Sequence, residues 1–362
     1  MRFLLALPVF CFAIACSSSQ DASHAEWQIL LDSIAADSNT PGVLLAFQGP
    51  EKAWAGAAGI AEYEGAALHE DAPVRIASNT KTLVAAALLR LWEDDAVELD
   101  DPISKYLSAE EIALLASDGY DADAMTLRHL LTHTAGLFDH AQSDAYFQAV
   151  FSQPDRVWTP WEQVEGAVDW GDPLGPAGAA FSYSDTGYVL LGLVITRVTE
   201  QPLGAAVRSL LDFETLGMTA TWWESVEAPP SAVQPRPHQY LDEIDTYAFH
   251  PSLDLHGGGG LVASMEDLAG FWHALFNGEV FRKPATLDTM LTSPLGASAV
   301  YRMGIFQREM AGFTVYEHSG FWGTEALYIP ELDIAIAGAV TQQDAFPSLR
   351  ALMEESIHRL AN

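Results

Sequence analysis

The chain has 362 residues and carries 49 Asp plus Glu against 17 Lys plus Arg, which gives a formal charge of −32 at pH 7. A field this negative repels nucleic acid and anionic lipid headgroups, so nucleic-acid binding is disfavoured from the start. With 49% hydrophobic and 18% charged residues, the composition is that of a globular protein with a core, and the charge is expected on its solvated surface.

The first residues have the pattern of a secretory signal. Met1-Arg2 supplies a positive start, and residues 3–15 form an apolar run that is too short to span a membrane. Cys11 leaves with this segment, so the mature chain has no partner for an internal disulfide. We therefore expect a signal peptide over 1–15 and an exported protein.

Two interpretations of the cleavage site stay open. Ala13-Ile14-Ala15 is a small-x-small site for an ordinary signal peptidase, whereas Ala15-Cys16, followed by polar residues, is similar to a lipoprotein box. The second interpretation predicts Cys16 as a lipid-attachment site, 16–25 as a tether, and a periplasmic protein anchored to the outer membrane. The first predicts a soluble secreted protein. Membrane contact is expected only through such an anchor.

Apolar and alternating runs bounded by turn residues predict strands and helices in a clear order. Predicted strands are 42–48, 52–60, 300–307, 313–317, 325–329 and 334–340. A helical region between the two sets of strands includes 79–94, 127–132, 188–198, 203–210 and 265–276. Helices over 24–36 and 346–360 are expected to cover the sheet.

These elements predict an α/β fold, in which an antiparallel sheet is flanked by helices and joined to an all-α lobe. We expect one domain over 26–362, with the α/β part at about 26–77 and 255–362 and the helical lobe at about 78–254. The active cleft is predicted where the two parts meet.

Ser78-Asn79-Thr80-Lys81 opens the helix predicted at 79–94. Residues three apart share a helix face, so Lys81 can point at the Ser78 hydroxyl. A serine becomes nucleophilic when a neighbouring base takes its proton, and a desolvated lysine can do so or can tune a second base. The chain has only four lysines, and a buried catalytic role fits the retention of this one.

Two further motifs accompany this pair, Tyr183-Ser184-Asp185 and His318-Ser319-Gly320. With these three motifs in this order, the sequence resembles the serine β-lactamase and penicillin-recognising family. The resemblance is to the branch of class C β-lactamases, D-alanyl-D-alanine carboxypeptidases and related esterases. It implies the β-lactamase/DD-peptidase-like fold and extends to the segments 74–77, 127–137 and 258–264.

The resemblance also implies a role for each motif residue. Ser78 is the acylated nucleophile, Lys81 assists proton transfer, and Tyr183 is the base or a proton relay. The strand bearing His318, Ser319 and Gly320 borders the substrate. The backbone N–H groups of Ser78 and Phe321 match the pair that forms the oxyanion hole, and Gly320 is expected to let substrate lie close along the strand.

Two positions depart from the common family pattern. His318 stands where many β-lactamases have a lysine, so a permanent cation is replaced by a group expected to titrate near neutrality. Asp185 stands where the motif often has Asn, and a carboxylate there favours protonated Lys81 and opposes ionisation of Tyr183. We hypothesise that Asp185 holds Lys81 charged and leaves proton abstraction to Tyr183.

Other chemistries are poorly supported. His129 and His133 are four residues apart, but no Glu follows His129 as in a zinc protease, so we expect no metal. No cofactor is implied. The leading hypothesis is an exported serine hydrolase acting on D-amino-acid peptides, amides or esters. The alternatives are a class C-like β-lactamase and a catalytically silent envelope binding protein. The negative charge favours neutral small-molecule substrates over anionic β-lactams.

Overall fold

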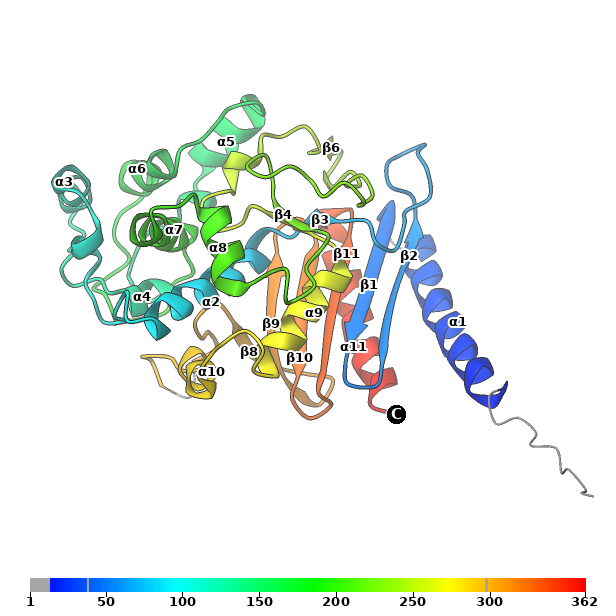
Figure 1. Cartoon of the computed structure of the whole chain (residues 1–362). Helices are drawn as coiled ribbons and strands as arrows, with labels where there is room; N and C mark the ends of the chain where they lie inside the picture. The colour runs from blue at the N-terminus through cyan, green and yellow to red at the C-terminus, as the bar shows by residue number, and fades with distance from the viewer. Residues whose placement is uncertain (1–13, 38, 297–298) are drawn as a thin grey trace, which may run out of the picture.

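The structure is a computed structural model that describes residues 14–37, 39–296 and 299–362, with side chains of the first helix described from residue 24. The predicted signal peptide 1–15 thus falls almost wholly outside the described residues, and the side chain of Cys16 is not described. Figure 1 shows a central sheet with a helical lobe beside it. In the described part of the chain, no helix is both long and apolar enough to cross a membrane.

A six-stranded antiparallel sheet, in the order β2-β1-β11-β10-β9-β8, forms the centre of the α/β part. In chain order its strands are β1 (Gly42–Gln48), β2 (Ala53–Gly59), β8 (Phe306–Met310), β9 (Phe313–Gly320), β10 (Thr324–Ile329) and β11 (Ile334–Val340). The strand predicted at 300–307 is wrong over most of its length. A tight loop precedes β8 there, since the Arg302 N–H donates to the Ile305 carbonyl at 2.7 Å and Gly304 has φ +76°.

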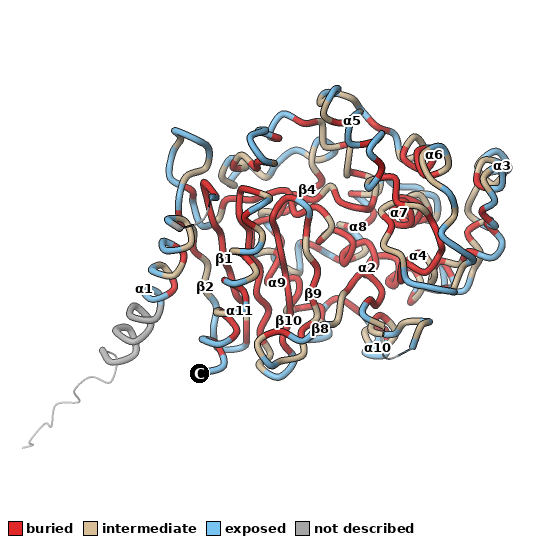
Figure 2. Tube along the Cα trace, turned by 180° about the vertical axis from the view of Figure 1, so that it is seen from behind, coloured by how far each residue is buried: buried red, intermediate tan, exposed pale blue. Residues whose placement is uncertain are grey.

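Helices cover both faces of this sheet. Helices α1 (Ile14–Asp37) and α11 (Phe346–Leu360) lie on one face, which Figure 2 shows from behind, and α9 (Met265–Phe276) lies on the other. The alternation of β1 explains this, because Val43 and Leu45 belong to the core with α11 while Leu44 belongs to the core with α9. The predicted covering helices are therefore confirmed. The helix predicted at 265–276 is α9, and it packs on the sheet, within the segment 255–362 that we expected in the α/β part.

Helix α1 begins at Ile14, before the predicted start at residue 24, and so includes the segment predicted as a tether. No Gly or Pro occurs between Ile14 and Asp37 to end a helix.

The lobe is built around α2 (Thr80–Glu93), most of whose residues are buried. Its small Ala and Leu side chains allow other helices to pack on every side of it. Of the other helices, α7 (Asp185–Thr199), α8 (Leu203–Leu211) and α10 (Pro284–Met290) pack on α2, and the lobe also includes α3 (Ala109–Ser117), α4 (Leu127–Leu131), α5 (Asp144–Ser152) and α6 (Pro160–Trp170). The predicted helices 79–94, 127–132, 188–198 and 203–210 are thereby confirmed.

A second, three-stranded sheet links the lobe to the central sheet. Its order is β3 (Val74–Arg75), β7 (Leu261–Ala263) and β4 (Thr221–Trp223), and a short ribbon of β5 (Tyr240–Leu241) and β6 (Ile244–Asp245) lies apart from it. Strands of two or three residues are too short to show a period in the sequence, so they were not predicted. Strand β3 leads directly to Ser78 and places it at the junction of the two parts.

Candidate active site

Ser78 lies in a 3-10 turn, Ala77–Asn79, between β3 and α2, rather than in the first turn of an α-helix. Ala77 has φ +45°, a left-handed conformation that costs energy for a residue other than glycine and is common where a side chain must be presented. Buried Asn79 fixes the turn, because its Nδ2 donates to the Ile76 carbonyl at 3.1 Å and to Thr324 Oγ1 on β10 at 3.0 Å. The turn is thus held against the first residue of β10, an interior strand of the central sheet.

Lys81 is fully buried, and several acceptors surround its ammonium. Nζ donates to Ser78 Oγ at 2.8 Å and to the Gly258 carbonyl at 2.7 Å, and it pairs with Asp185 Oδ1 at 2.5 Å. These acceptors can satisfy the N–H groups of an ammonium, which donates only. The hydroxyl and the amine expected to lie together therefore do so.

The surroundings of Lys81 favour its charged form. Burial alone lowers the pKa of the amine, but the negative charge of Asp185, with contributions from the acidic groups of Tyr183 and Asp254, outweighs it and holds the pKa of Lys81 above its usual value. The structure therefore agrees with the first half of our hypothesis, that Asp185 keeps Lys81 protonated.

Tyr183, just before α7, is hydrogen-bonded to both Ser78 and Lys81. Lys81 Nζ also lies 5.1 Å from the centre of its ring. Burial raises the pKa of the Tyr183 phenol, and Asp185 raises it further despite the opposing effect of Lys81. At neutral pH the two candidate bases are therefore both protonated, which leaves open which of them gives up its proton during turnover.

His318, near the end of β9, is 1% exposed. Its Nε2 lies 3.2 Å from Tyr301 Oη, and its Nδ1 lies 2.9 Å from the Ser319 carbonyl oxygen. Burial, reinforced by the nearby charge of Lys81, lowers the pKa of His318 to about 3. The expectation that this histidine titrates near neutrality is therefore wrong, because it is enclosed by protein and stays neutral.

Gly320 is required for packing within the protein. A Cβ at this position would lie 2.2 Å from the Ile76 carbonyl oxygen and 2.3 Å from Thr324 Oγ1. A side chain at this position would therefore meet the segment that leads to Ser78, so packing within the protein accounts for the glycine. Phe321, the next residue, is 41% exposed and faces the pocket.

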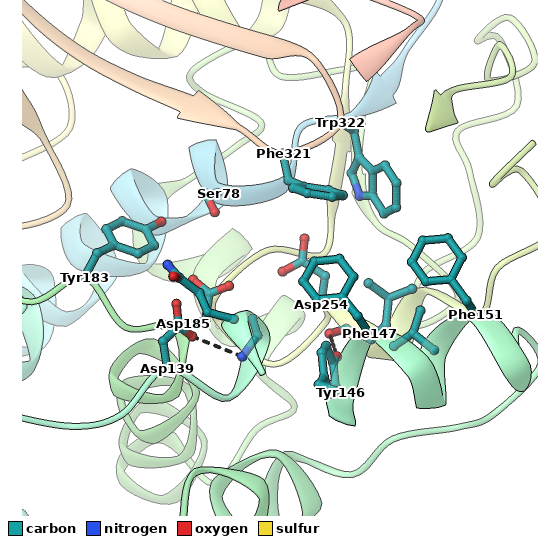
Figure 3. Close-up of a pocket in the computed structure, with 14 residues that line it drawn as sticks. Ser78, Asp139, Tyr146, Phe147, Phe151, Tyr183, Asp185, Asp254, Phe321 and Trp322 are labelled. Atoms are coloured by element: carbon teal, nitrogen blue, oxygen red, sulfur yellow. Dashed lines mark hydrogen bonds between the residues drawn. The ribbon is translucent and has the colours of Figure 1, made fainter. Parts of the chain in front are cut away.

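A pocket of about 470 Å³ opens beside Ser78 (Figure 3). Of the predicted site residues, Ser78, Tyr183, Asp185 and Phe321 line it, whereas Lys81 lies beneath it and His318, Ser319 and Gly320 are not among its lining residues. The lining residues that were not predicted are Asp139, Ala141, Gln142, Tyr146, Phe147, Val150, Phe151, Leu253, Asp254 and Trp322. One wall is thus aromatic and another is acidic.

The unpredicted carboxylates, Asp139 and Asp254, come from segments far from the motifs in sequence. Asp139 precedes a short 3-10 turn at His140–Gln142, and Asp254 follows another at Pro251–Leu253. The sequence offers one kind of signal, an acidic residue beside a distinctive segment. Asp139 directly follows the run Ala135-Gly136-Leu137-Phe138, and Asp254 comes shortly before a run of glycines. Burial raises the pKa of each carboxyl to about 7, and the charge of Asp185 adds to that effect.

Comparisons with known proteins agree with this site. The chain is 29% identical to the esterase EstB of Burkholderia gladioli over 283 residues, which covers 68% of each chain. Its structure is similar to a D-stereospecific amidohydrolase from Streptomyces sp. (TM-score 0.78, 27% identity, 91% of this chain and 97% of that one). It is also similar to a D-amino acid amidase from Ochrobactrum anthropi complexed with L-phenylalanine amide (TM-score 0.74, 25% identity, 94% and 99%).

A sequence model of the Beta-lactamase family matches residues 28–356, which is nearly the whole described chain. The matched region contains the sheet, the lobe and the hydroxyl–amine pair at their junction. The chain therefore belongs to the beta-lactamase family and is a serine hydrolase of that fold.

Proposed function

We propose that the chain hydrolyses small D-amino-acid amides, esters or peptides through an acyl-enzyme formed on Ser78. The observation that carries this proposal is the 2.8 Å contact of Lys81 Nζ with Ser78 Oγ at the edge of a pocket large enough for a small substrate. The amidase and esterase names of its relatives support amides and esters as the substrate class.

In the proposed reaction, the Tyr183–Lys81 pair first loses one proton to solvent, which leaves Tyr183 as a phenolate beside the Lys81 ammonium. Ser78 Oγ then attacks the substrate carbonyl carbon while its proton passes to the Tyr183 phenolate oxygen. Lys81 stays charged beside Asp185 and stabilises the phenolate that accepts this proton. The backbone N–H groups of Ser78 and Phe321 bind the developing oxyanion. The proton then passes to the leaving amine or alcohol, and a water molecule cleaves the acyl-enzyme in the second half of the reaction.

β-Lactamase activity has weaker support. Common β-lactams carry a carboxylate, and the described residues that line the pocket include no Lys, Arg or His. A neutral His318 cannot supply the missing positive charge. We therefore rank amides and esters above β-lactams as substrates.

The test is a panel of D- and L-phenylalanine amide, nitrophenyl acetate and a fluorescent penicillin, each with wild type and Ser78→Ala. We expect turnover of an amide or ester that Ser78→Ala loses by at least about 10³-fold. Ser117→Ala, on the exposed surface of α3, is the matched control and should retain full activity. Absence of Ser78-dependent turnover across the panel would reject the proposal and favour a silent binding protein.

We also propose export, with residues 1–15 as the signal and Cys16 as the lipid-attachment site. The support is the sequence pattern alone. Cys16→Ser should move the protein from the membrane fraction to the soluble periplasmic fraction. Equal fractionation of the two proteins would favour cleavage without lipid attachment.

A further inference from the structure

The pocket beside Ser78 holds more negative than positive charge. Asp139, Asp185 and Asp254 all line it, and Figure 3 shows their carboxylates directed toward the same space. Lys81 is the buried cation at this place, and it forms its close ion pair with Asp185 alone. The charges of Asp139 and Asp254 are therefore not balanced by a close ion pair within the described residues.

Asp139 is held in place by hydrogen bonds to only one of its two carboxylate oxygens. It is 6% exposed, and its Oδ1 accepts hydrogen bonds from the backbone N–H groups of Asp185 at 3.0 Å and Ala141 at 3.2 Å. Its Oδ2 receives no hydrogen bond from the residues that the structure describes, although it belongs to a side chain that lines the pocket. This oxygen is therefore accessible from the pocket, where an N–H donor of a bound molecule can reach it.

Asp254 is in a similar position on the loop before Gly257. None of the described residues donates a hydrogen bond to its carboxylate. A Cβ on Gly259 would lie 1.9 Å from Asp254 Oδ2, so the absence of a side chain there makes room for the carboxylate. Its backbone N–H bonds to the Pro251 carbonyl at 3.0 Å, which holds the loop.

The nearby basic groups do not neutralise this pair. The Arg75 guanidinium forms an ion pair with Glu224, to which it donates from Nε at 2.6 Å and from a terminal nitrogen at 3.2 Å. Burial lowers the pKa of His140 to about 4 and also lowers the pKa of His256, so both rings are neutral at neutral pH. A cation that enters the pocket can therefore supply positive charge to carboxyls that otherwise hold protons near pH 7.

We infer that Asp139 and Asp254 bind a positively charged amino group of the substrate, so that the site selects aminoacyl amides and esters with a free α-amine. This inference rests on the proposed acyl-enzyme function. An α-ammonium is two bonds from the carbonyl carbon that Ser78 attacks, and its N–H groups make strong, charge-assisted hydrogen bonds to carboxylates. The aromatic wall formed by Phe147, Phe151 and Phe321 then accommodates an apolar substrate side chain.

The inference changes the substrate expected from net charge. A chain with a formal charge of −32 disfavours anions, and we had expected neutral esters and amides. The pocket adds a second preference, because two carboxyls without a close ion pair lie in the pocket that Ser78 lines. They favour a cationic substrate over a neutral one. Blocking the amine by acylation removes the charge and adds bulk in the acidic part of the pocket.

The test compares three p-nitroanilides at neutral pH that share one leaving group. They are D-phenylalanine p-nitroanilide, its N-acetyl derivative, and 3-phenylpropionyl p-nitroanilide, which lacks the amino group. Wild type should prefer the free amine by about 10- to 100-fold in kcat/KM, the size of a charged hydrogen bond. Asp254→Asn and Asp139→Asn should each reduce this preference, mainly through KM. Asp288→Asn, on the exposed surface of α10, should retain it.

The outcomes separate the inference from the function on which it rests. Ser78-dependent turnover of all three anilides at equal kcat/KM in wild type would overturn the inference and leave the proposed function intact. If no acyl compound were turned over in a Ser78-dependent way, both the inference and the proposed function would be overturned. The wild-type comparison needs no variant, so it holds even if a substitution prevents folding. Unchanged preference in both folded Asp→Asn variants would also overturn the assignment.

Discussion

Two groups of buried charges flank β9, and they are built differently. On the side of the pocket, the ammonium of Lys81 faces three carboxylates. On the side of α11, Glu317 and Glu325 lie with two guanidinium groups: Arg308 donates to Glu317 at 2.5 Å, and Arg350 lies 3.1 Å from Glu325. The second group, which we call the sheet cluster, has two carboxyls and two guanidinium groups and is closed to solvent on its acidic side, with both carboxyl side chains at most 1% exposed.

The difference indicates what each group does. A closed cluster interacts only with other groups of the protein, so its effect is expected on folding and on the pH dependence of stability. An open group with excess carboxylates can bind positive charge from a substrate that enters the pocket. Its effect is therefore expected on substrate choice and rate. Variants in each group test this division.

Lys81→Met should have the largest effect. It removes the cation that balances Asp185, leaves a buried carboxylate without its partner and should cost about 3–5 kcal/mol of stability. It should also lower kcat by at least about 10³-fold, because no charge then supports proton transfer from Ser78. Urea unfolding and steady-state kinetics measure the two losses.

The control for this variant is Lys105→Met, whose ammonium is 53% exposed and pairs with Asp101 on the surface. It should cost at most about 1 kcal/mol and leave activity unchanged. Near-normal activity of Lys81→Met would contradict the assignment of the ammonium to the reaction.

Gly320→Ala should have the next largest effect, since Gly320 ends the strand that separates the two groups. The added methyl would meet the Ile76 carbonyl and so would push β9 away from the turn that carries Ser78. We expect a loss of about 1–3 kcal/mol and a marked fall in kcat. The matched control is Gly270→Ala in α9, where an added Cβ has no atom within 4 Å and should be neutral or stabilising. Equal melting temperatures for Gly320→Ala and wild type would contradict this packing argument.

Much of this arrangement could be predicted from the sequence where the determinants are local. The apolar run of β1 and the periodicity of α11 predicted those elements closely, and the three-residue spacing of Ser78 and Lys81 predicted their contact. Asp139 and Asp254 could not be found in this way, because loops far apart in the chain bring them to the pocket. The neutrality of His318 depends on enclosure by Tyr301 and the rest of the fold, which no local pattern reveals.

Asp185→Asn should shift the pH–rate profile by an intermediate amount. The Asp185 carboxylate raises the pKa values of both Lys81 and Tyr183, so its removal lowers both. If loss of a proton from this pair activates the enzyme, kcat/KM rises with pH in wild type, and the rise should move about 1 unit or more toward lower pH in the variant. The measurement uses a substrate that does not titrate, such as 3-phenylpropionyl p-nitroanilide. Superimposable pH–rate profiles of the variant and wild type would show that Asp185 does not set the pKa of the group that acts as the base.

Glu325→Gln should have the smallest effect, confined to stability. Burial raises the pKa of Glu325 to about 8, with Arg350 opposing and Glu317 adding to the shift, whereas the unfolded value is near 4.5. The folded state therefore holds a proton that the unfolded state releases, so stability is greatest below about pH 4.5 and falls as pH rises toward 8. A glutamine is uncharged, like protonated Glu325, so the variant should lack this fall in stability with rising pH. The variant should match wild type in stability near pH 4.5 and be more stable than wild type at pH 8, and thermal unfolding at the two pH values measures this difference.

Glu317→Gln gives the contrast within the sheet cluster, because Glu317 accepts a hydrogen bond from Arg308 at 2.5 Å and another from Arg350 at 3.3 Å. Removing its charge leaves two guanidinium groups with one carboxylate, so this variant should be less stable than wild type at pH 8. Neither change should alter kcat by more than about twofold, since both side chains face α11 and not the pocket. A large loss of activity in either variant with normal Tm would show that the two groups are coupled through β9, and the division between a folding cluster and a substrate pocket would then fail.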